Sequence, residues 1–460
     1  MEPQPEPAAI EIPEQLNLAD WLLDARLREG SGDRTALRLP DRNLTYAEVA
    51  THSCRFANVL AGLGLRPEER VFLALPDGAD LVAALFGILR AGGVAVLLNP
   101  ELTAEAVAAL IDYLRPRLAV VDGRLAPLYA SALGASIERT ELVTVGDRAP
   151  GCPSFEEFAR TVADHFPTVR THRDDPAVLL FSGGTTGRPK AVVQSHRSYA
   201  FTARAYGQGT LGMGSGDITL AVPKLYFGYA MGSNLFFPFS VGGSACLFPE
   251  KATADSIFAA IARHRPTLLI NVPTMIQQMV NHPGAGTQDL SSLRLATSAG
   301  EALAVTLRER WNSTFGVELL DGLGTAEQWH VFLSHRPGRV RPGTLGEVVP
   351  GFDVRVRDGD GNDLPDGEIG ALWVRGGARA WGYFREMDKT QATFRGEWVV
   401  PGDLVSRDAD GFFTYQGRGD DVFKVAGKWF SPAEVEGTLL RHPQVAECAV
   451  VAIADSNGLL

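Results

Sequence analysis

The sequence is poor in cysteine, in net positive charge and in long apolar runs, and each shortage excludes a class of protein. The 460 residues include four cysteines, which make no C-x-x-C pair, so neither a zinc site nor a disulfide framework is indicated. The net charge of −11 argues against a nucleic-acid-binding protein. No apolar run is long enough to cross a bilayer, and the acidic, proline-rich start does not look like a signal peptide. We therefore expect a cytoplasmic protein without nucleic-acid or membrane partners.

The composition is that of an ordinary globular protein in a long chain, with 45% hydrophobic and 21% charged residues. The length exceeds what one core usually serves, so two or more subdomains are expected. Buried-type strands alternate with helical patterns along residues 45–122 and 256–320, which is typical of parallel α/β sheets with crossover helices. From about residue 343 to 375, short alternating strands with Gly and Asp turns suggest a small β-barrel.

The two ends of the chain differ from this central part. Residues 1–15 resemble a disordered leader. Near the other end, a capped helix, a loop and a strand read as the opening of an α/β domain with nothing to complete it, which would leave an open edge strand. We interpret residues 16–417 as a large N-terminal domain, 418–422 as a hinge, and 423–460 as the beginning of a small C-terminal domain that is cut short.

The most specific string is FSGGTTGRPKAVV, residues 181–193, between two expected strands. Glycines let backbone N–H groups approach an anion closely, while hydroxyls and cations add donors and charge. It is not a Walker loop, because Pro precedes the lysine, Ala follows it and a strand comes next. The alternative is a mobile surface turn. The candidate phosphate ligands are Ser182, Gly183, Gly184, Thr185, Thr186, Gly187, Arg188 and Lys190.

The whole string resembles the phosphate loop of adenylate-forming enzymes, which include acyl- and aryl-CoA ligases, peptide-synthetase adenylation domains and luciferases. Ser182 and Gly183 stand where Thr and Ser are commoner in that superfamily. Further motifs follow in the family's order, so the resemblance covers almost the whole chain. It implies a large domain with two α/β sheets and a small β-barrel, followed by a small mobile α/β domain.

The segment DGLGTAEQWH, residues 321–330, resembles the family's Y-G-x-T-E motif. The resemblance implies that Glu327 holds Mg²⁺, which prefers hard oxygen ligands. Ala326 replaces the commoner Thr, and Thr325 is the candidate substitute, while Leu323 stands where many relatives have an aromatic residue that stacks on adenine. The alternative for Glu327 is a solvent-exposed loop residue. Asp321 and Gly322 are further candidate nucleotide-binding residues.

Two shorter strings carry weaker predictions. The segment SAGEAL follows a strand and is expected to open a helix; the resemblance implies that its residues line the adenine and acyl pockets, although a plain helix start explains it equally well. In PGDL, Asp403 matches a residue that accepts hydrogen bonds from both ribose hydroxyls, whereas a common Gly-Asp turn is the alternative. The SAGEAL candidates are Ser298, Ala299, Gly300 and Glu301.

The string GRGDDVFKVAGKWF, which starts at residue 417, resembles the family's interdomain hinge. The resemblance implies that Arg418 contacts ribose or phosphate, that Asp420 is the hinge residue and that Lys424 approaches the nucleotide. Relatives also carry a catalytic lysine near the end of the small domain, which lies beyond this chain. We therefore expect this chain to bind the acid or its adenylate but to adenylate poorly.

The segment PKLYFGYAMGSN resembles benzoate-type CoA ligases, so Phe227 and Tyr229 are expected to wall an aromatic-acid pocket. Ala299, Gly324 and His330 complete the candidate pocket. The alternative is that the aromatic residues and the histidine belong to the core.

The resemblance implies ATP- and Mg²⁺-dependent activation of a benzoate-type acid to an aryl-adenylate, with transfer to CoA. Lys190 and Glu327, with Thr325, are the candidate catalytic residues, and no covalent nucleophile is required. Two rivals stay open. One passes the acyl group to a carrier protein or an amine, and the other is a non-catalytic acyl or nucleotide binder. A homodimer is also open.

Overall fold

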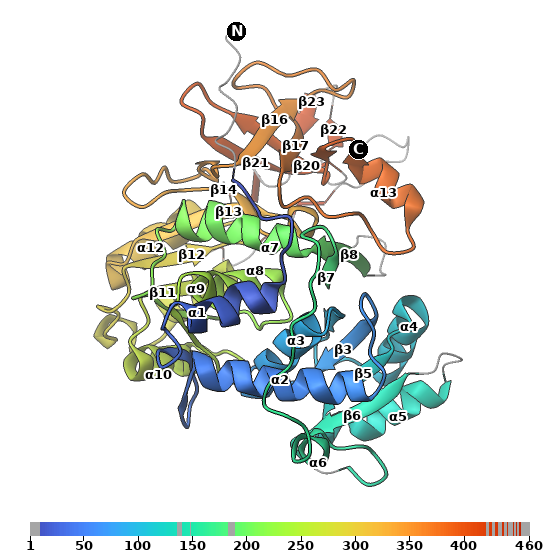
Figure 1. Ribbon diagram of the computed structural model, residues 1–460. Helices are drawn as coiled ribbons and strands as arrows, with labels where there is room; N and C mark the ends of the chain where they lie inside the picture. The colour runs from blue at the N-terminus through green and yellow to red at the C-terminus, as the bar shows by residue number, and fades with distance from the viewer. Residues whose placement is uncertain are drawn as a thin grey trace.

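The computed structural model describes residues 10–135, 140–147, 149–182, 189–419, 423–425 and 428–430, and single positions beyond. Three sheets lie one above another in Figure 1, the lower one mainly in blue to green, the middle one mainly in yellow and the upper one in orange. The largest cluster of buried side chains runs through all three sheets. The α/β class predicted from the alternating pattern is confirmed.

The lower sheet has six strands in the order β6-β5-β3-β4-β7-β8. Its first five strands are parallel, and β8 at the edge is antiparallel to β7. The strands are β3 (Arg70–Ala74), β4 (Val94–Leu97), β5 (Leu118–Asp122), β6 (Glu141–Val145), β7 (Pro176–Ser182) and β8 (Lys190–Ser195); the helices between them are α3 (Ala79–Arg90), α4 (Ala104–Leu114), α5 (Ala126–Ala135) and the short α6 (Phe155–Ala159), with a 3₁₀ turn η2 (Gly123–Leu125).

The helix α2 (Tyr46–Gly62) packs against α3 and starts as the sequence predicts. The Thr45 side chain accepts a hydrogen bond from the backbone of Glu48, and the Glu48 carboxylate accepts one from the backbone of Thr45. This reciprocal pair satisfies two N–H groups that the first helical turn leaves free. The two helices approach closely because Gly87 has no side chain, as a Cβ there would lie 2.6 Å from Cβ of Phe56.

The middle sheet has nine strands in the order β15-β14-β13-β12-β11-β9-β10-β1-β2. Its centre is parallel, and antiparallel strands close both edges. The strands are β1 (Thr35–Arg38), β2 (Asn43–Thr45), β9 (Ile218–Ala221), β10 (Ser244–Cys246), β11 (Leu268–Asn271), β12 (Leu295–Ser298), β13 (Leu319–Gly324), β14 (Val331–Ser334) and β15 (Glu347–Val348).

Helices and short helical turns precede or connect the strands of this sheet, and one of them starts later than predicted. The helix expected at the SAGEAL string begins only at Val305, because Gly300 has a φ of 89° and the chain turns before the helix starts. The helical elements are η1 (Asp20–Asp24), α1 (Ala25–Arg28), α7 (His196–Thr202), η3 (Ala203–Gln208), α8 (Gly228–Met231), η4 (Gly232–Phe236), α9 (Phe237–Ser240), α10 (Ala254–His264), α11 (Pro273–Asn281), η5 (Ala285–Thr287), α12 (Val305–Phe315) and η6 (Ala326–Gln328).

The upper sheet corrects the expectation of a barrel. Its strand order is β18-β19-β17-β20-β21, with β16 paired to β17, so the described strands form an open sheet. The sheet stays open because its edge strands β16, β18 and β21 do not pair with one another in the described part of the chain. The elements are β16 (Phe352–Arg357), β17 (Gly370–Gly376), α13 (Met387–Thr393), β18 (Phe394–Arg395), β19 (Trp398–Val399), β20 (Asp403–Arg407) and β21 (Phe413–Arg418), followed by a separate hairpin of β22 (Phe423–Val425) and β23 (Lys428–Phe430).

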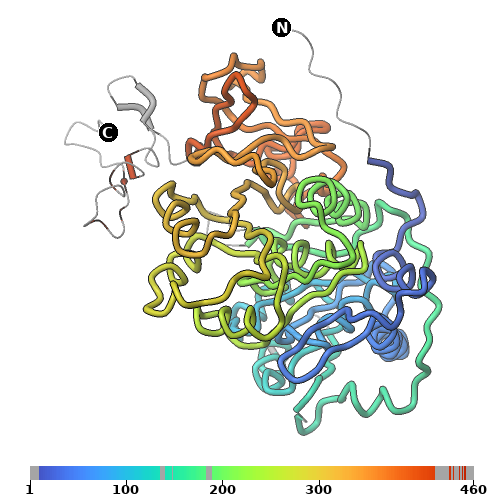
Figure 2. Tube along the Cα trace, turned by 90° about the vertical axis from the view of Figure 1, so that its left-hand side faces the viewer, coloured from blue at the N-terminus to red at the C-terminus, as the bar shows by residue number. Residues whose placement is uncertain are grey.

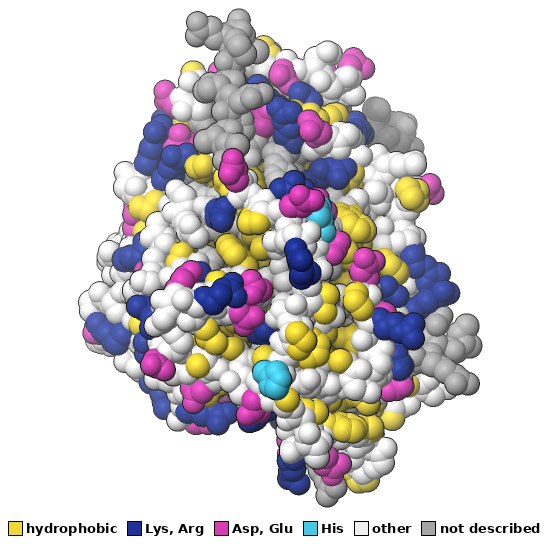
Figure 3. All heavy atoms as spheres, viewed as in Figure 1, with side chains coloured by type: hydrophobic (Ala, Val, Ile, Leu, Met, Phe, Trp, Pro, Cys, Tyr) yellow, Lys and Arg dark blue, Asp and Glu magenta, His cyan; other side chains and the backbone are white. Residues whose placement is uncertain are grey.

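The middle layer joins the layers above and below it, as the turned trace in Figure 2 shows. Basic and acidic side chains are interspersed over the face in Figure 3. The four cysteines are free thiols. Among the described helices, none combines the length and the apolar character that a membrane span needs.

Candidate functional site

The predicted phosphate loop joins two strands that pair with each other. Strands β7 and β8 run antiparallel, and Ser182 pairs with Lys190, so the two ends of the loop are held side by side. The strands predicted on either side of the loop are thereby confirmed. Six predicted ligands, Gly183, Gly184, Thr185, Thr186, Gly187 and Arg188, lie outside the described residues.

A short segment, Trp381–Phe384, extends the lower sheet beside β8. Trp381 donates its backbone N–H to the carbonyl of Val193 at 3.0 Å, and Phe384 donates to the carbonyl of Ala191 at 2.8 Å. Tyr383 forms an antiparallel bridge with Val192. This pairing places the Tyr383 ring beside the first residue of β8, with Nζ of Lys190 4.8 Å from the ring centroid.

Glu327 reaches the same tyrosine from the turn η6. Its side chain is buried, and the Tyr383 hydroxyl donates to Oε1 of Glu327 at 2.6 Å. The Glu327 carbonyl accepts from the backbone of Ala380 at 2.9 Å, and Gln194 on β8 donates to the carbonyl of Ala326 at 2.5 Å. Two of the predicted catalytic residues therefore contact the same tyrosine, Glu327 through the hydroxyl and Lys190 through the ring.

Thr325 lies just before this turn. Its Oγ1 is buried and, among the described residues, has no hydrogen-bond partner. A buried hydroxyl without a partner costs free energy, so such an atom is a candidate contact for a ligand.

Asp403 lies in the upper sheet near these residues. It is 5% exposed and accepts hydrogen bonds at Oδ1 from Arg418 at 3.3 Å and from the Tyr415 hydroxyl at 3.4 Å. Burial raises the pKa of Asp403, Arg418 opposes that rise, and the charge of Glu327 adds to it. The carboxylates of Asp403 and Glu327 are therefore close enough to interact electrostatically. Asp420 lies outside the described residues, and the backbone of Lys424 lies in β22.

The SAGEAL residues end β12 and line the start of the next turn. Ser298 and Ala299 are buried, whereas Glu301 is exposed and accepts hydrogen bonds from the backbone and hydroxyl of Thr274 at 3.2 and 2.7 Å. Its carboxylate is thus bound to the first turn of α11, which leaves its backbone for the predicted nucleotide contact.

Strand β13 carries the remaining nucleotide candidates. Asp321 is buried, and burial raises its pKa to about 7 although Arg308 opposes the rise. Leu323 is half-buried. Gly322 and Gly324 are required by close packing, because a Cβ at Gly324 would lie 2.6 Å from the His330 backbone, and one at Gly322 would lie 2.7 Å from the Leu333 carbonyl.

His330 lies in a cage of aromatic rings. The centroids of Phe237, Tyr206 and Tyr229 are 4.7, 5.4 and 5.4 Å from the centroid of its ring. Its Nε2 lies 3.1 Å from the Tyr229 carbonyl and 3.1 Å from the Ser233 hydroxyl. Burial lowers the pKa of His330 to about 3, so the imidazole is neutral at physiological pH. Because a carbonyl only accepts, Nε2 carries the hydrogen, and the buried Nδ1 is an acceptor without a partner in the described part of the chain.

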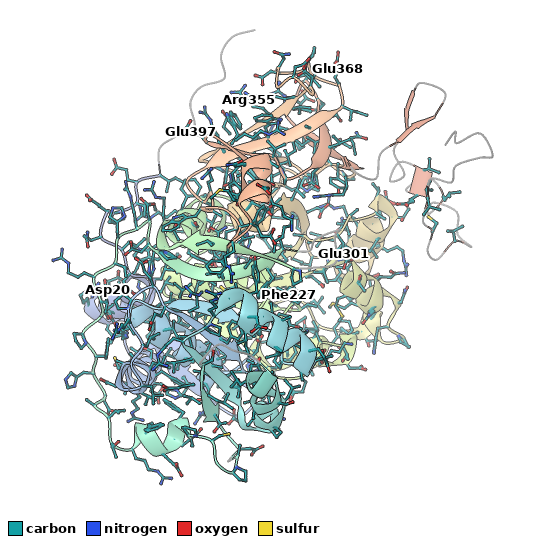
Figure 4. All side chains as sticks on the ribbon, turned by 90° about the vertical axis from the view of Figure 1, so that its right-hand side faces the viewer. Asp20, Phe227, Glu301, Arg355, Glu368 and Glu397 are labelled. Carbon is teal, nitrogen blue, oxygen red and sulfur yellow. The ribbon has the colours of Figure 1, made fainter. Side chains whose placement is uncertain are left out.

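The structure separates the two aromatic residues predicted to wall the pocket. Tyr229 is half-buried and shares a hydrogen bond of 2.6 Å with the hydroxyl of Thr297 at the end of β12. Phe227 is 53% exposed and contacts Tyr226, with ring centroids 4.6 Å apart. Of these two residues, Tyr229 belongs to the cage around His330, whereas Phe227 is exposed near the centre of the view in Figure 4. The role of Phe227 in a pocket stays a prediction.

Sequence reasoning missed Tyr383, Gln194 and Trp329. Trp329 is buried and has a φ of 60°, which is rare for a bulky residue and reverses the chain between Glu327 and His330. The local sequence offers one weak signal, the aromatic Tyr383 directly after a glycine. Gln194 and Trp329 have no such signal, because their roles come from contacts with distant strands.

Two cavities of about 630 and 350 Å³ lie away from these residues. The first is lined by Arg173, Arg197 and Arg204 with the N-terminal segment, and the second by Asp77 and Asp80 with neighbouring loops. Neither cavity is lined by Lys190, Glu327 or His330. The candidate site is therefore defined by the contacts among its side chains and not by either cavity.

Comparison with known proteins gives consistent matches. Residues 24–384 match the family described as AMP-binding enzyme. The chain is 37% identical to benzoate–CoA ligase of Thauera aromatica, over 99% of this chain and 86% of that protein. It is also 37% identical to 4-hydroxybenzoate–CoA/benzoate–CoA ligase of Rhodopseudomonas palustris, over 96% and 82%. The crystal structure of the anthranilate CoA ligase AuaEII with anthranoyl-AMP superposes with a TM-score of 0.92 at 37% identity, covering 96% of this chain and 85% of that one.

Proposed function

Because the chain belongs to the family of AMP-binding enzymes, we propose that it activates a benzoate-type carboxylic acid with ATP and transfers the aryl group to CoA. The observation that carries the proposal is that Lys190 and Glu327 both contact Tyr383 at the end of the loop between β7 and β8. Lys190 lies over the ring, and Glu327 accepts a hydrogen bond from the hydroxyl. The similarity to benzoate– and hydroxybenzoate–CoA ligases supports the substrate class. The superfamily resemblance inferred from the motifs is confirmed by the family match.

The described residues fit a magnesium–phosphate group. Glu327 supplies a carboxylate that suits Mg²⁺, and Lys190 supplies an ammonium that suits phosphate oxygens. Thr325 adds a buried hydroxyl that has no partner among the described residues. We expect Glu327 to hold the ion and Lys190 to bind a phosphate oxygen. When bound, Mg²⁺ would neutralise the negative charge that builds up on the phosphates.

The first half-reaction joins the acid to AMP. A carboxylate oxygen of the substrate attacks the α-phosphorus of ATP, the bond from that phosphorus to the bridging oxygen breaks, and pyrophosphate leaves with the bond's electron pair. The transition state concentrates negative charge on phosphoryl oxygens. Lys190 faces that charge from the loop's exit, and positioned cations of this kind are the main protein contribution to such transfers.

The second half-reaction forms the thioester. The sulfur of CoA attacks the acyl carbon of the adenylate, the thiol proton is released, and AMP leaves with the electron pair of the broken C–O bond. We propose that Asp403 and Arg418 hold the ribose of the adenylate, because Asp403 is a buried acceptor paired with a cation beside Glu327.

The aromatic ring of the acid is proposed to lie against the cage of His330, Tyr229 and the neighbouring SAGEAL backbone. The cage is apolar and its histidine is neutral, so it suits an uncharged ring better than a second charge. Ala299 and Gly324 complete this wall as small residues. A cytoplasmic location and the homodimer stay predictions.

The test uses the full-length protein with benzoate, ATP and Mg²⁺, in the presence and absence of CoA. We expect pyrophosphate release and benzoyl-AMP without CoA, and benzoyl-CoA and AMP with it, measured by mass spectrometry. Benzoyl-AMP that reacts with a pantetheinylated carrier protein but not with CoA would instead favour the carrier-protein alternative. Absence of pyrophosphate release with every benzoate tested would favour a binding protein.

A further inference from the structure

Tyr383 contacts both charged groups on which the proposed chemistry depends, although no motif marked it. Its hydroxyl donates to Oε1 of Glu327 at 2.6 Å, and its ring centroid lies 4.8 Å from Nζ of Lys190. We propose, on the basis of the proposed function, that Tyr383 is a positioning residue that orients the Glu327 carboxylate toward the metal ion and holds Lys190 at the loop. It would act through these two residues and exchange no proton with the substrate.

The position of Tyr383 is fixed independently of the site. Tyr383 is 7% exposed, and its ring packs edge-on against Phe394 with ring centroids 5.5 Å apart. Its backbone N–H donates to Oγ1 of Thr390 at 3.0 Å, and its bridge to Val192 ties it to β8. A hydroxyl on so rigid a support fixes the direction of the group that accepts its hydrogen bond.

The Glu327 carboxylate depends on this hydrogen bond for its direction. Its backbone is held by Ala380 and, through Ala326, by Gln194. In the described part of the chain, however, the carboxylate accepts one side-chain hydrogen bond, from Tyr383 to Oε1. That bond occupies one oxygen and leaves the other, Oε2, for a cation. A buried, charge-assisted bond of this kind is stronger than one between neutral groups.

The hydroxyl and the ring of Tyr383 serve different partners, so they can be tested separately. The hydroxyl contacts Glu327, whereas the negative face of the ring attracts the ammonium of Lys190. Tyr383→Phe removes the first contact and keeps the second. Tyr383→Leu removes both contacts.

The experiment measures Mn²⁺ binding by electron paramagnetic resonance, with the full-length protein and a non-hydrolysable ATP analogue and therefore without turnover. We expect Tyr383→Phe to raise the Mn²⁺ dissociation constant about tenfold, with unchanged affinity for the analogue in the absence of metal. Tyr383→Leu should in addition weaken binding of the analogue in the absence of metal, because Lys190 loses its contact with the ring. In steady-state assays kcat should fall for Tyr383→Phe while KM for benzoate stays constant.

The matched control is Tyr113→Phe. The Tyr113 hydroxyl donates to the carbonyl of Phe384 at 2.6 Å, so this variant loses an equally short hydrogen bond to the same segment without touching Glu327. We expect wild-type Mn²⁺ affinity for it. Unchanged Mn²⁺ affinity in Tyr383→Phe, or an equal loss in Tyr113→Phe, would overturn the inference. A wild-type protein that binds Mn²⁺ and nucleotide but never forms benzoyl-AMP would refute the proposed function instead.

Discussion

The turn η6 separates two regions of the site that differ in polarity. On the side of β8, Glu327 carries a charge and meets Tyr383 and Lys190. Three positions later, His330 is neutral, enclosed by aromatic rings and shielded from water. The positive φ of Trp329 reverses the chain between them. One short stretch of chain thereby serves a phosphate region and an aromatic-acid region.

The difference follows from what each region must bind. Phosphate transfer concentrates negative charge, which fixed cations and a metal ion can neutralise. An aromatic ring gains from apolar contact, and a nearby unpaired charge would have to be desolvated at high cost. Keeping the two regions on opposite sides of a strained turn allows both conditions to hold within a few residues.

The largest effect is expected from removing the charge on the polar side. Glu327→Gln keeps the size of the side chain, and we expect ATP–pyrophosphate exchange to fall about 100-fold, or about 2.7 kcal/mol in the barrier. KM for benzoate should stay within about twofold, since the aromatic side is untouched. The control is Glu397→Gln, an exposed carboxylate of the upper sheet paired with Arg375. A large rise in KM for benzoate would break the separation of the two regions.

On the aromatic side, added volume should affect stability and acid binding. A Cβ at Gly232 would lie 2.5 Å from Cδ2 of His330, so Gly232→Ala is expected to lower the free energy of unfolding by about 2 kcal/mol and to raise KM for benzoate. Urea unfolding and steady-state kinetics measure the two effects. Gly214→Ala, where a Cβ meets nothing within 4 Å, should leave both unchanged. Equal behaviour of the two variants would mean that the cage tolerates an extra methyl group.

The pH dependence of stability should report the neutral histidine. The pKa of His330 is about 3 in the folded state because of burial and about 6.5 when unfolded. Below pH 6.5 the unfolded chain therefore binds a proton that the folded chain does not, and the free energy of unfolding falls as pH decreases. Between pH 7 and pH 5, we expect the free energy of unfolding of His330→Gln to fall by about 1–2 kcal/mol less than that of the wild type. Urea unfolding at the two pH values measures this difference. Parallel pH curves for the two proteins would contradict a neutral His330.

The smallest effect concerns the hydrogen bond between Ser233 and His330. Ser233→Ala removes a hydroxyl 3.1 Å from Nε2, while the Tyr229 carbonyl keeps its own contact with that nitrogen. We expect a loss of about 1 kcal/mol in thermal or urea unfolding. Ser313→Ala on the exposed face of α12 is the matched control. A loss above about 3 kcal/mol would show that polar contacts hold His330 more firmly than the rings do.

Much of the fold was predictable because its signals are local. The capping pair of Thr45 and Glu48, the buried strands of the lower sheet and the crossover helices follow from spacing within ten or so residues, and the structure confirms them. The closure of the upper sheet and the start of α12 were predicted wrongly. Closure depends on whether the distant edge strands β16, β18 and β21 pair with one another, and the start of α12 depends on a turn at Gly300.

The candidate site was predictable to a smaller degree. Lys190, Glu327 and Asp403 stand in recognisable strings, and the structure brings the first two together, while their roles stay predictions. Phe227 and Tyr229 stand in one string, yet one is exposed and the other belongs to the cage. Tyr383 escaped because its partner Glu327 lies 56 positions away.

The sequence by itself determined which chemical groups are present and the order of the motifs, because glycine loops, capping pairs and apolar strands depend on neighbours along the chain. Only the tertiary structure decided which groups meet. Tyr383 reaches Lys190 because its segment pairs with β8, and His330 is neutral because distant rings exclude water from it. Orientation and pKa depend on contacts across layers, and local sequence does not encode those contacts.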